Sequence, residues 1–193
     1  MKTLFLLVLS FGLCAASRSQ DNKPVELKDV LGPRNSFNDP VMGVSLTYPA
    51  GWEVIGGMRW GPDLRENTFR FRPLWPSETN PSMYYQGFRP DNPRPTDVNA
   101  WLLEAAKKKE ASRQGGGSDY RNDPQTLTLR TIAGRPGLSY IATFGSGSRK
   151  MAEYNVRVVG EKAYVMFFTF GPLEDVLAIR GEIDQMAETV RVP

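Results

Sequence analysis

A run of five consecutive apolar residues, 164–168 (YVMFF), constrains the fold of this chain more than any other feature. A strand with one solvated face alternates apolar and polar residues, whereas a strand that is apolar at every position is buried on both faces. Each face of the sheet that holds this strand must therefore be covered by another layer. We predict that helices supply the cover on both sides.

Two segments have the sequence pattern of such helices. The first begins at Thr96, which we predict to be its N-cap, and its apolar residues recur at helical spacing until residues 115–117 (GGG) end it. The second follows Pro172, a residue that suits the first turn of a helix, and its broad apolar stripe runs to Val190. Two covering layers are thus available.

Further segments have the alternation, or the β-branched and aromatic composition, of strands. They are residues 44–48, 52–54, 68–72, 82–88, 127–129, 138–144, 151–159 and 163–170. Residues 160–162 (GEK) have the length of a hairpin connection between the last two. The sequence therefore predicts an α+β fold, with an antiparallel sheet of about six or seven strands flanked by helices in an α/β/α sandwich.

The order of these elements is itself informative. A strand that runs into the turn at residues 48–52 (YPAGW) is followed by a helix, a meander of hairpins and a closing helix that ends at residues 186–192 (MAETVRV). In this order the chain resembles the PsbP/Mog1-like family of α/β/α sandwich domains, including its bacterial secreted relatives. The resemblance covers most of residues 37–193. It implies a small binding or assembly protein, and it offers no catalytic motif to transfer.

Residues 1–16 (MKTLFLLVLSFGLCAA) have the layout of a secretory signal peptide, with a lysine, an apolar run and small residues at the end. The apolar run is shorter than the roughly 20 residues that a membrane-spanning helix needs, which favours cleavage over anchoring. A lipoprotein signal has a small residue before its cysteine, but Leu13 precedes Cys14, so we do not expect a lipid anchor. We expect a secreted or periplasmic protein that does not span a membrane when mature.

The rest of the chain divides into two parts. Residues 17–36 are polar and lack periodicity, and we predict a flexible leader there. Residues 37–193 are long enough for a single domain with a substantial core. The 24 basic and 21 acidic residues nearly balance, which argues against a nucleic-acid partner because such a partner demands a clustered basic face.

Composition excludes several kinds of chemistry. The chain contains no histidine, and its one cysteine, Cys14, lies in the predicted signal peptide. A Ser-His-Asp or Cys-His nucleophile is therefore excluded, and zinc and copper lose their usual ligands. We interpret Asp119 and Asp123 as turn residues rather than calcium ligands, and residues 145–150 (GSGSRK) as a hairpin turn rather than a phosphate-binding loop. We expect no metal and no cofactor.

Arginine and aromatic residues interleave in the first half of the chain, as they do on surfaces that stack ligands. Alternation explains residues 69–72 (FRFR) more simply, with the rings inward and the arginines in solvent. Trp52 and Trp101 lie in apolar patterns, and we predict that both are core residues.

The candidate functional surface lies in the proline-rich part of the chain. Six of the fifteen prolines fall within residues 73–95, and proline lowers the entropy of a free loop, so these segments are expected to hold one shape. We predict a partner-binding surface made by Trp60, Arg72, Trp75 and Arg89, because loops carry function more often than core positions do. The competing interpretation is that both tryptophans cover an edge of the sheet.

These observations favour a non-enzymatic binding or assembly domain whose partner is a protein or another component of the cell envelope. Two alternatives stay open: a carboxylate-dependent hydrolase acting on a carbohydrate or envelope polymer, and a purely structural envelope component. A pocket lined by two converging acids would favour the hydrolase. An exposed apolar patch would favour the binding domain.

Overall fold

A computed structural model describes residues 30–60, 66–74, 81–89, 95–145 and 150–193. For residues 57–60, 66 and 67 it describes the backbone. The predicted signal peptide and residues 17–29 of the predicted leader lie outside the described residues.

The larger of two sheets has eight strands in the described chain, each antiparallel to its neighbours. The order across it is β4-β5-β6-β11-β10-β9-β7, and β8 pairs with the first half of β9. The strands are β4 Trp52–Trp60, β5 Glu66–Pro73, β6 Met83–Phe88, β7 Arg121–Asn122, β8 Thr128–Ile132, β9 Arg135–Phe144, β10 Met151–Val159 and β11 Tyr164–Pro172. The predicted α+β fold with an antiparallel sheet is confirmed.

A smaller sheet of three strands packs beside it: β1 Leu31–Gly32, β2 Ser36–Asp39 and β3 Val44–Thr47. β1 and the first residue of β2 fall within residues 17–36, for which the sequence predicts a flexible leader. Val30, just before β1, is only 1% exposed. Apolar burial therefore holds this last part of the predicted leader against the core.

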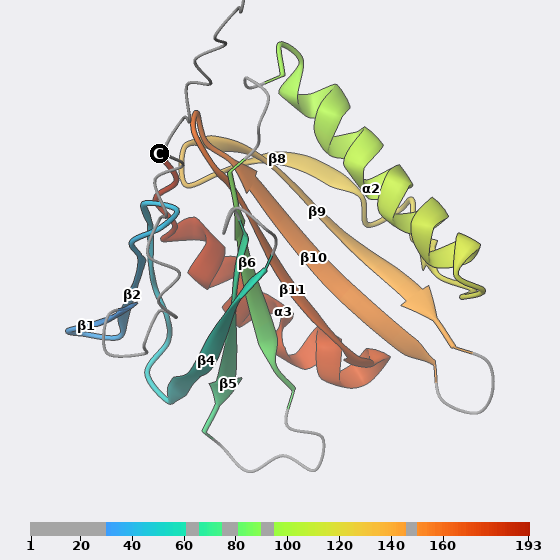
Figure 1. Cartoon of the computed structure of the whole chain (residues 1–193). Helices are drawn as coiled ribbons and strands as arrows, with labels where there is room; N and C mark the ends of the chain where they lie inside the picture. Colours follow the sequence, from blue (N-terminus) through green and yellow to red (C-terminus); the bar gives the residue numbers. More distant parts are fainter. Residues whose placement is uncertain (1–29, 61–65, 75–80, 90–94, 146–149) are drawn as a thin grey trace, which may run out of the picture.

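Two long helices of the described chain lie on opposite faces of the large sheet (Figure 1). α3, Leu173–Glu188, begins directly after Pro172 as predicted. α2, Val98–Gly115, ends at the predicted glycine run, but its N-cap is Asp97 and not Thr96. The Asp97 carboxylate accepts a hydrogen bond from the Ala100 amide at 2.9 Å, and its charge suits the positive end of the helix.

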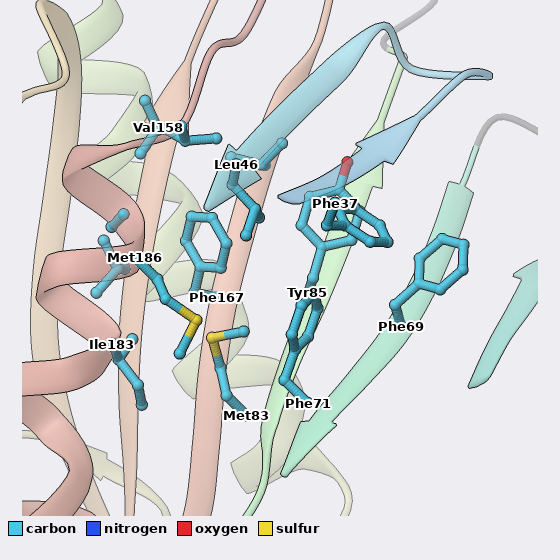
Figure 2. Close-up of a cluster of buried hydrophobic side chains, with 14 of the residues drawn as sticks. Phe37, Leu46, Phe69, Phe71, Met83, Tyr85, Val158, Phe167, Ile183 and Met186 are labelled. Carbon is cyan, nitrogen blue, oxygen red and sulfur yellow. The ribbon is translucent and has the colours of Figure 1, made fainter. Parts of the chain in front are cut away.

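The main core lies between the large sheet, α3 and the small sheet. Figure 2 shows Phe167 of β11 between α3 and the aromatic residues that come from β2, β5 and β6. Phe37 of β2 is fully buried and meets Phe69 and Tyr85 edge to face, at centroid distances of 4.8 and 5.2 Å. Such edge-to-face contacts are favourable for aromatic pairs, and here they join the two sheets.

A buried carboxylate also fixes the small sheet to the large one. Asp39 is 1% exposed, and its Oδ1 accepts hydrogen bonds from the amides of Val41 and Met42 at 3.0 and 3.1 Å. Its Oδ2 accepts a hydrogen bond from the hydroxyl of Tyr85 at 3.1 Å. Burial, together with this carboxylate, raises the pKa of Tyr85, so the phenol stays protonated and keeps donating.

The two tryptophans that were predicted to be core residues differ in the structure. Trp52 is 4% exposed, and its indole Nε1 donates to the carboxylate of Glu182 on α3, so the prediction is confirmed. Trp101 is half-buried and contacts the ring of Tyr164 edge to face at 5.2 Å. The prediction is wrong for Trp101, because this residue lies at the margin of the contact between α2 and the sheet.

The central strand β11 is covered unevenly. Val165 and Phe167 are fully buried on the α3 side, whereas Tyr164, Met166 and Phe168 on the opposite face are only half-buried. α2 lies along β9 and β7, away from β4 to β6 (Figure 1). The prediction that residues 164–168 are buried on both faces is therefore wrong for the second face. A helix about 10 Å wide covers roughly two strands that are about 4.8 Å apart, and this sheet is wider than that.

Candidate functional site

Of the four predicted partner-binding residues, the structure describes the side chains of Arg72 and Arg89, and these two lie far apart. Arg72 lies near the end of β5, and Arg89 is exposed directly after β6. β5 and β6 are antiparallel, with Glu66 opposite Phe88, so Arg72 and Arg89 are at opposite ends of this strand pair. Six residues of extended chain separate the two ends by about 20 Å.

The remaining contacts divide this surface further. Arg72 Nε donates to Glu53 Oε1 of β4 at 2.9 Å, and the two side chains form an ion pair. Arg72 therefore already has a partner within the sheet. The backbone of Trp60 ends β4 at the same end of the sheet as Arg89. The side chain of Trp60 and the whole of Trp75 lie outside the described residues. The predicted surface stays a prediction.

A different set of side chains comes together on the face that α2 leaves open. The strand registers place Arg70 of β5 opposite Tyr84 of β6, and Tyr84 opposite Phe168 of β11. Phe168 in turn lies opposite Asn155 of β10, and Asn155 lies opposite Tyr140 of β9. These five residues form one row across five strands, which runs from the open face to the underside of α2.

On the open face, two rings of this row stack with a third ring, Phe170, and lie next to a cation. Tyr84 and Phe168 stack at a centroid distance of 5.1 Å and an interplanar angle of 15°, and Phe170 stacks on Tyr84 at 5.7 Å and 13°. The guanidinium of Arg70 lies over the Tyr84 ring at 5.9 Å, within the range of a cation–π contact. We call Arg70, Tyr84, Phe168 and Phe170 the aromatic ladder. Its last ring, Phe170, is 48% exposed.

Lys109 of α2 lies beside Phe168, at the side of the ladder nearest to this helix. Its Nζ lies 5.3 Å from the Phe168 ring centroid, pairs with the carboxylate of Glu153 and donates to Asn155 Oδ1 at 2.8 Å. The Lys109 side chain is 16% exposed and that of Glu153 is 4% exposed. Burial lowers the pKa of Lys109, and the neighbouring Glu153 carboxylate offsets part of this effect. This buried pair attaches α2 to β10 and sets the border of the open face.

Two tyrosines and an arginine complete the polar cluster under α2. The hydroxyl of Tyr120 lies 3.5 Å from Glu153 Oε1, and Arg157 Nη2 lies 3.5 Å from the hydroxyl of Tyr140. Burial raises the pKa of both tyrosines. Tyr120, Tyr140 and Arg157 are all buried, so this cluster packs under α2 together with the pair of Lys109 and Glu153.

A pocket of about 180 Å³ lies at the exposed end of the aromatic ladder. It is lined by Arg70, Tyr84 and Phe170 of the ladder, by Pro81 and Ser82 before β6, and by Asp175 in the first turn of α3. A second pocket of about 490 Å³ lies between the small sheet and the end of α3, and Glu188 is its acidic residue. Each of these two pockets has one carboxylate, whereas the hydrolase alternative requires two converging acids.

The carboxylates of the two loop acids Asp119 and Asp123 bind backbone amides. Asp119 Oδ1 accepts a hydrogen bond from the Gly145 amide at 2.7 Å, and Asp123 Oδ1 accepts one from the Gln125 amide at 3.0 Å. Asp123 begins the turn at residues 123–126, so its interpretation as a turn residue is confirmed. Asp119 instead binds the amide of a residue 26 positions further along the chain. Among the residues that the structure describes, no three His, Cys, Asp or Glu side chains are grouped so that they could hold a metal ion.

Sequence reasoning missed the aromatic ladder. It assigned Arg70 to a solvated strand face and Phe168 to a strand buried on both sides. The ladder forms only when the registers of three strands bring positions 70, 84 and 168 side by side. The local patterns of a single sequence do not predict those registers. One usable signal was present: Phe168 and Phe170 flank Thr169, so the two-residue period of a strand places both rings on one face.

No protein-family model matches this sequence, and no curated protein matches it. Solved structures share its fold. CyanoP, the cyanobacterial PsbP of Synechocystis sp. PCC 6803, has a TM-score of 0.53 and 14% identity, and the alignment covers 84% of this chain and 95% of CyanoP. LpqN of Mycobacterium tuberculosis, described as involved in cell envelope biogenesis, has a TM-score of 0.51 and 10% identity, with 89% and 90% covered.

A crystal structure from Bacteroides thetaiotaomicron VPI-5482 has a TM-score of 0.54 and 12% identity over 82% of this chain. The alignment covers 48% of that protein, so the chain spans about half of its length. These similarities confirm the predicted PsbP/Mog1-like fold. No described helix is both long and apolar enough to cross a membrane.

Proposed function

We propose that this chain is an exported, non-enzymatic binding or assembly module that recognises a component of the cell envelope with its aromatic ladder. The observation that carries this proposal is the open face of the sheet. Tyr84 and Phe168 lie on central strands and yet are half-buried, and Phe170 is 48% exposed. An exposed group of apolar side chains with a polar rim is typical of a recognition surface.

Further observations support each part of the proposal. Residues 1–16 have the layout of a signal peptide, which supports export. LpqN, which has the same fold, is described as involved in cell envelope biogenesis, which supports an envelope role. The absence of histidine from the sequence and the single carboxylate of each described pocket support a non-enzymatic function.

A capture experiment tests this proposal. The exported protein, with a C-terminal tag, serves as bait for detergent-solubilised envelope from its own cells, and its intact mass is expected to show a chain that begins between Ser17 and Gln20. The double variant Tyr84→Ser/Phe170→Ser is expected to lose at least about tenfold in capture, because exposed aromatic residues carry much of the binding free energy of an interface.

Leu177→Ser is the matched control for this experiment. Leu177 is 48% exposed, as Phe170 is, but it lies on α3, on the other side of the sheet. Its variant is expected to capture as much as the wild type. Equal capture by the double variant, or an equal loss in the Leu177 variant, would reject the ladder as the binding surface. An Arg89→Ala arm tests the predicted loop surface in the same assay.

A further inference from the structure

We infer that the pocket at the end of the aromatic ladder binds one neutral sugar unit. The inference rests on the proposed function and deepens it, because it names the chemistry that this surface recognises. It is carried by three features of the pocket: polar groups of Arg70, Tyr84 and Asp175 that have no hydrogen-bond partner among the described residues, balanced charge and an apolar ring wall.

Two side chains of opposite charge line the pocket without pairing with each other. Arg70 Nε donates to Ser82 Oγ at 3.0 Å, and no described residue accepts a hydrogen bond from its two terminal nitrogens. Neither oxygen of Asp175 accepts a hydrogen bond in the described chain, and Oδ2 is buried. Buried polar atoms are nearly always hydrogen-bonded, so a carboxylate left in this state calls for an explanation. A bound group that donates to Asp175 and accepts from Arg70 provides one.

The two charges also select the class of ligand. An anionic ligand would be repelled by Asp175, and a cationic ligand would be repelled by Arg70. A neutral ligand that carries donors and acceptors side by side suits both residues. A hydroxyl group both donates and accepts, so neighbouring hydroxyls on one ring can serve Asp175 and Arg70 together. The hydroxyl of Tyr84, which also has no described partner, is a third group of the same kind.

The size and walls of the pocket fit a single ring. Its volume of about 180 Å³ lies below the range of roughly 300–1,000 Å³ that drug-sized ligands occupy. Phe170 stacks on Tyr84 and has no further ring partner among the described residues, so an exposed part of its ring is available. The C–H face of a sugar ring can pack against this surface while the hydroxyls face the polar groups. A neutral sugar thus matches both the apolar and the polar sides of the pocket.

The test is a titration of the isotope-labelled exported protein, followed by amide chemical shifts. The probes are the methyl glycosides of glucose, galactose, mannose and N-acetylglucosamine, the same four free sugars, and N-acetylalanine amide as a peptide-like compound. We expect saturable shifts at Phe170 and Asp175 with at least one sugar. Asp175→Ala and Arg70→Met are each expected to weaken that binding by about tenfold or more, since each removes a hydrogen bond to a charged group.

Glu174→Ala is the matched control, because Glu174 is an exposed carboxylate in the same turn of α3 that does not line the pocket. It is expected to bind as the wild type does. Preference for a glycoside identifies a linked sugar unit and preference for a free sugar identifies an unlinked one; either result supports the proposal. No saturable binding of any sugar, binding that survives both pocket variants, or pocket-dependent binding of the amide alone would overturn it. Ladder-dependent capture without sugar binding would retain the proposed function and reject the sugar.

Discussion

At the scale of single residues, one carboxylate on α3 organises the contact of this helix with two strands. Asp184 Oδ1 accepts a hydrogen bond from the hydroxyl of Tyr154 on β10 at 2.6 Å, and Asp184 forms an ion pair with Arg130 on β8. Arg180 lies over the Tyr154 ring at 5.0 Å. Burial, helped by the hydrogen bond to Asp184, raises the pKa of Tyr154 to about 12.

This raised pKa predicts a defined alkaline behaviour. A phenol with an unfolded pKa of about 10 holds its proton more tightly in the folded state, so its contribution to stability is complete below pH 10 and is lost as the pH rises towards 12. Tyr154→Phe is expected to cost about 1 kcal/mol at pH 7 through the lost hydrogen bond. Ionisation of Tyr154 lowers the free energy of unfolding of the wild type by up to about 1.4 kcal/mol per pH unit between pH 10 and 12. The variant should lack this part of the decline. Urea unfolding at pH 7, 10 and 12 measures both effects, and parallel pH profiles for the two proteins would contradict the assignment.

At the scale of elements, the position of α2 depends on the buried pair of Lys109 and Glu153. Removing one partner of a buried ion pair leaves an uncompensated charge, which typically costs about 3–5 kcal/mol, whereas replacing both partners with apolar residues is often neutral. Lys109→Met is therefore expected to lower the free energy of unfolding by several kcal/mol, and adding Glu153→Met should restore much of that loss. Denaturant unfolding of the two single variants and the double variant measures the coupling.

The chain offers a matched control for this cycle. Lys108 is the neighbouring lysine on α2 and is exposed. Lys108→Met is expected to change stability by less than about 0.5 kcal/mol, as surface substitutions usually do. If Lys109→Met were no more harmful than Lys108→Met, the pair would not hold α2 on the sheet.

At the scale of the whole molecule, the structure extends the packed domain towards the N-terminus. Val30 is buried, and β1 pairs with β2 through Leu31 opposite Phe37. A chain that begins at Phe37 is expected to be less stable than one that begins at Val30 by about 2 kcal/mol, mainly from the lost burial of the valine side chain. The two chains differ only in residues 30–36, so urea unfolding of both isolates this segment. Equal unfolding midpoints would show that residues 30–36 add no stability and belong to the predicted leader.

Local periodicity made most of the fold predictable. The alternation at residues 44–48 and 68–72, the apolar spacing after Thr96 and the stripe after Pro172 all produced the predicted elements. One error was also local: Asp97, one residue later than predicted, caps α2, because both residues are good caps and only the backbone geometry selects between them. These features depend on neighbours within a few positions along the chain, and a sequence records such spacing directly.

The sequence by itself determined the class of fold, the exclusion of histidine and cysteine chemistry from residues 17–193, and the burial of one face of the central strand. Only the tertiary structure decided that α2 lies on the β9 side and leaves the aromatic ladder open. The ladder joins Arg70, Tyr84 and Phe168 through strand registers, and its pocket also needs Asp175 from α3. Contacts between positions far apart in the chain set those registers and the helix position. A spacing pattern predicts which residues face the same way, but packing decides which of those faces stays exposed.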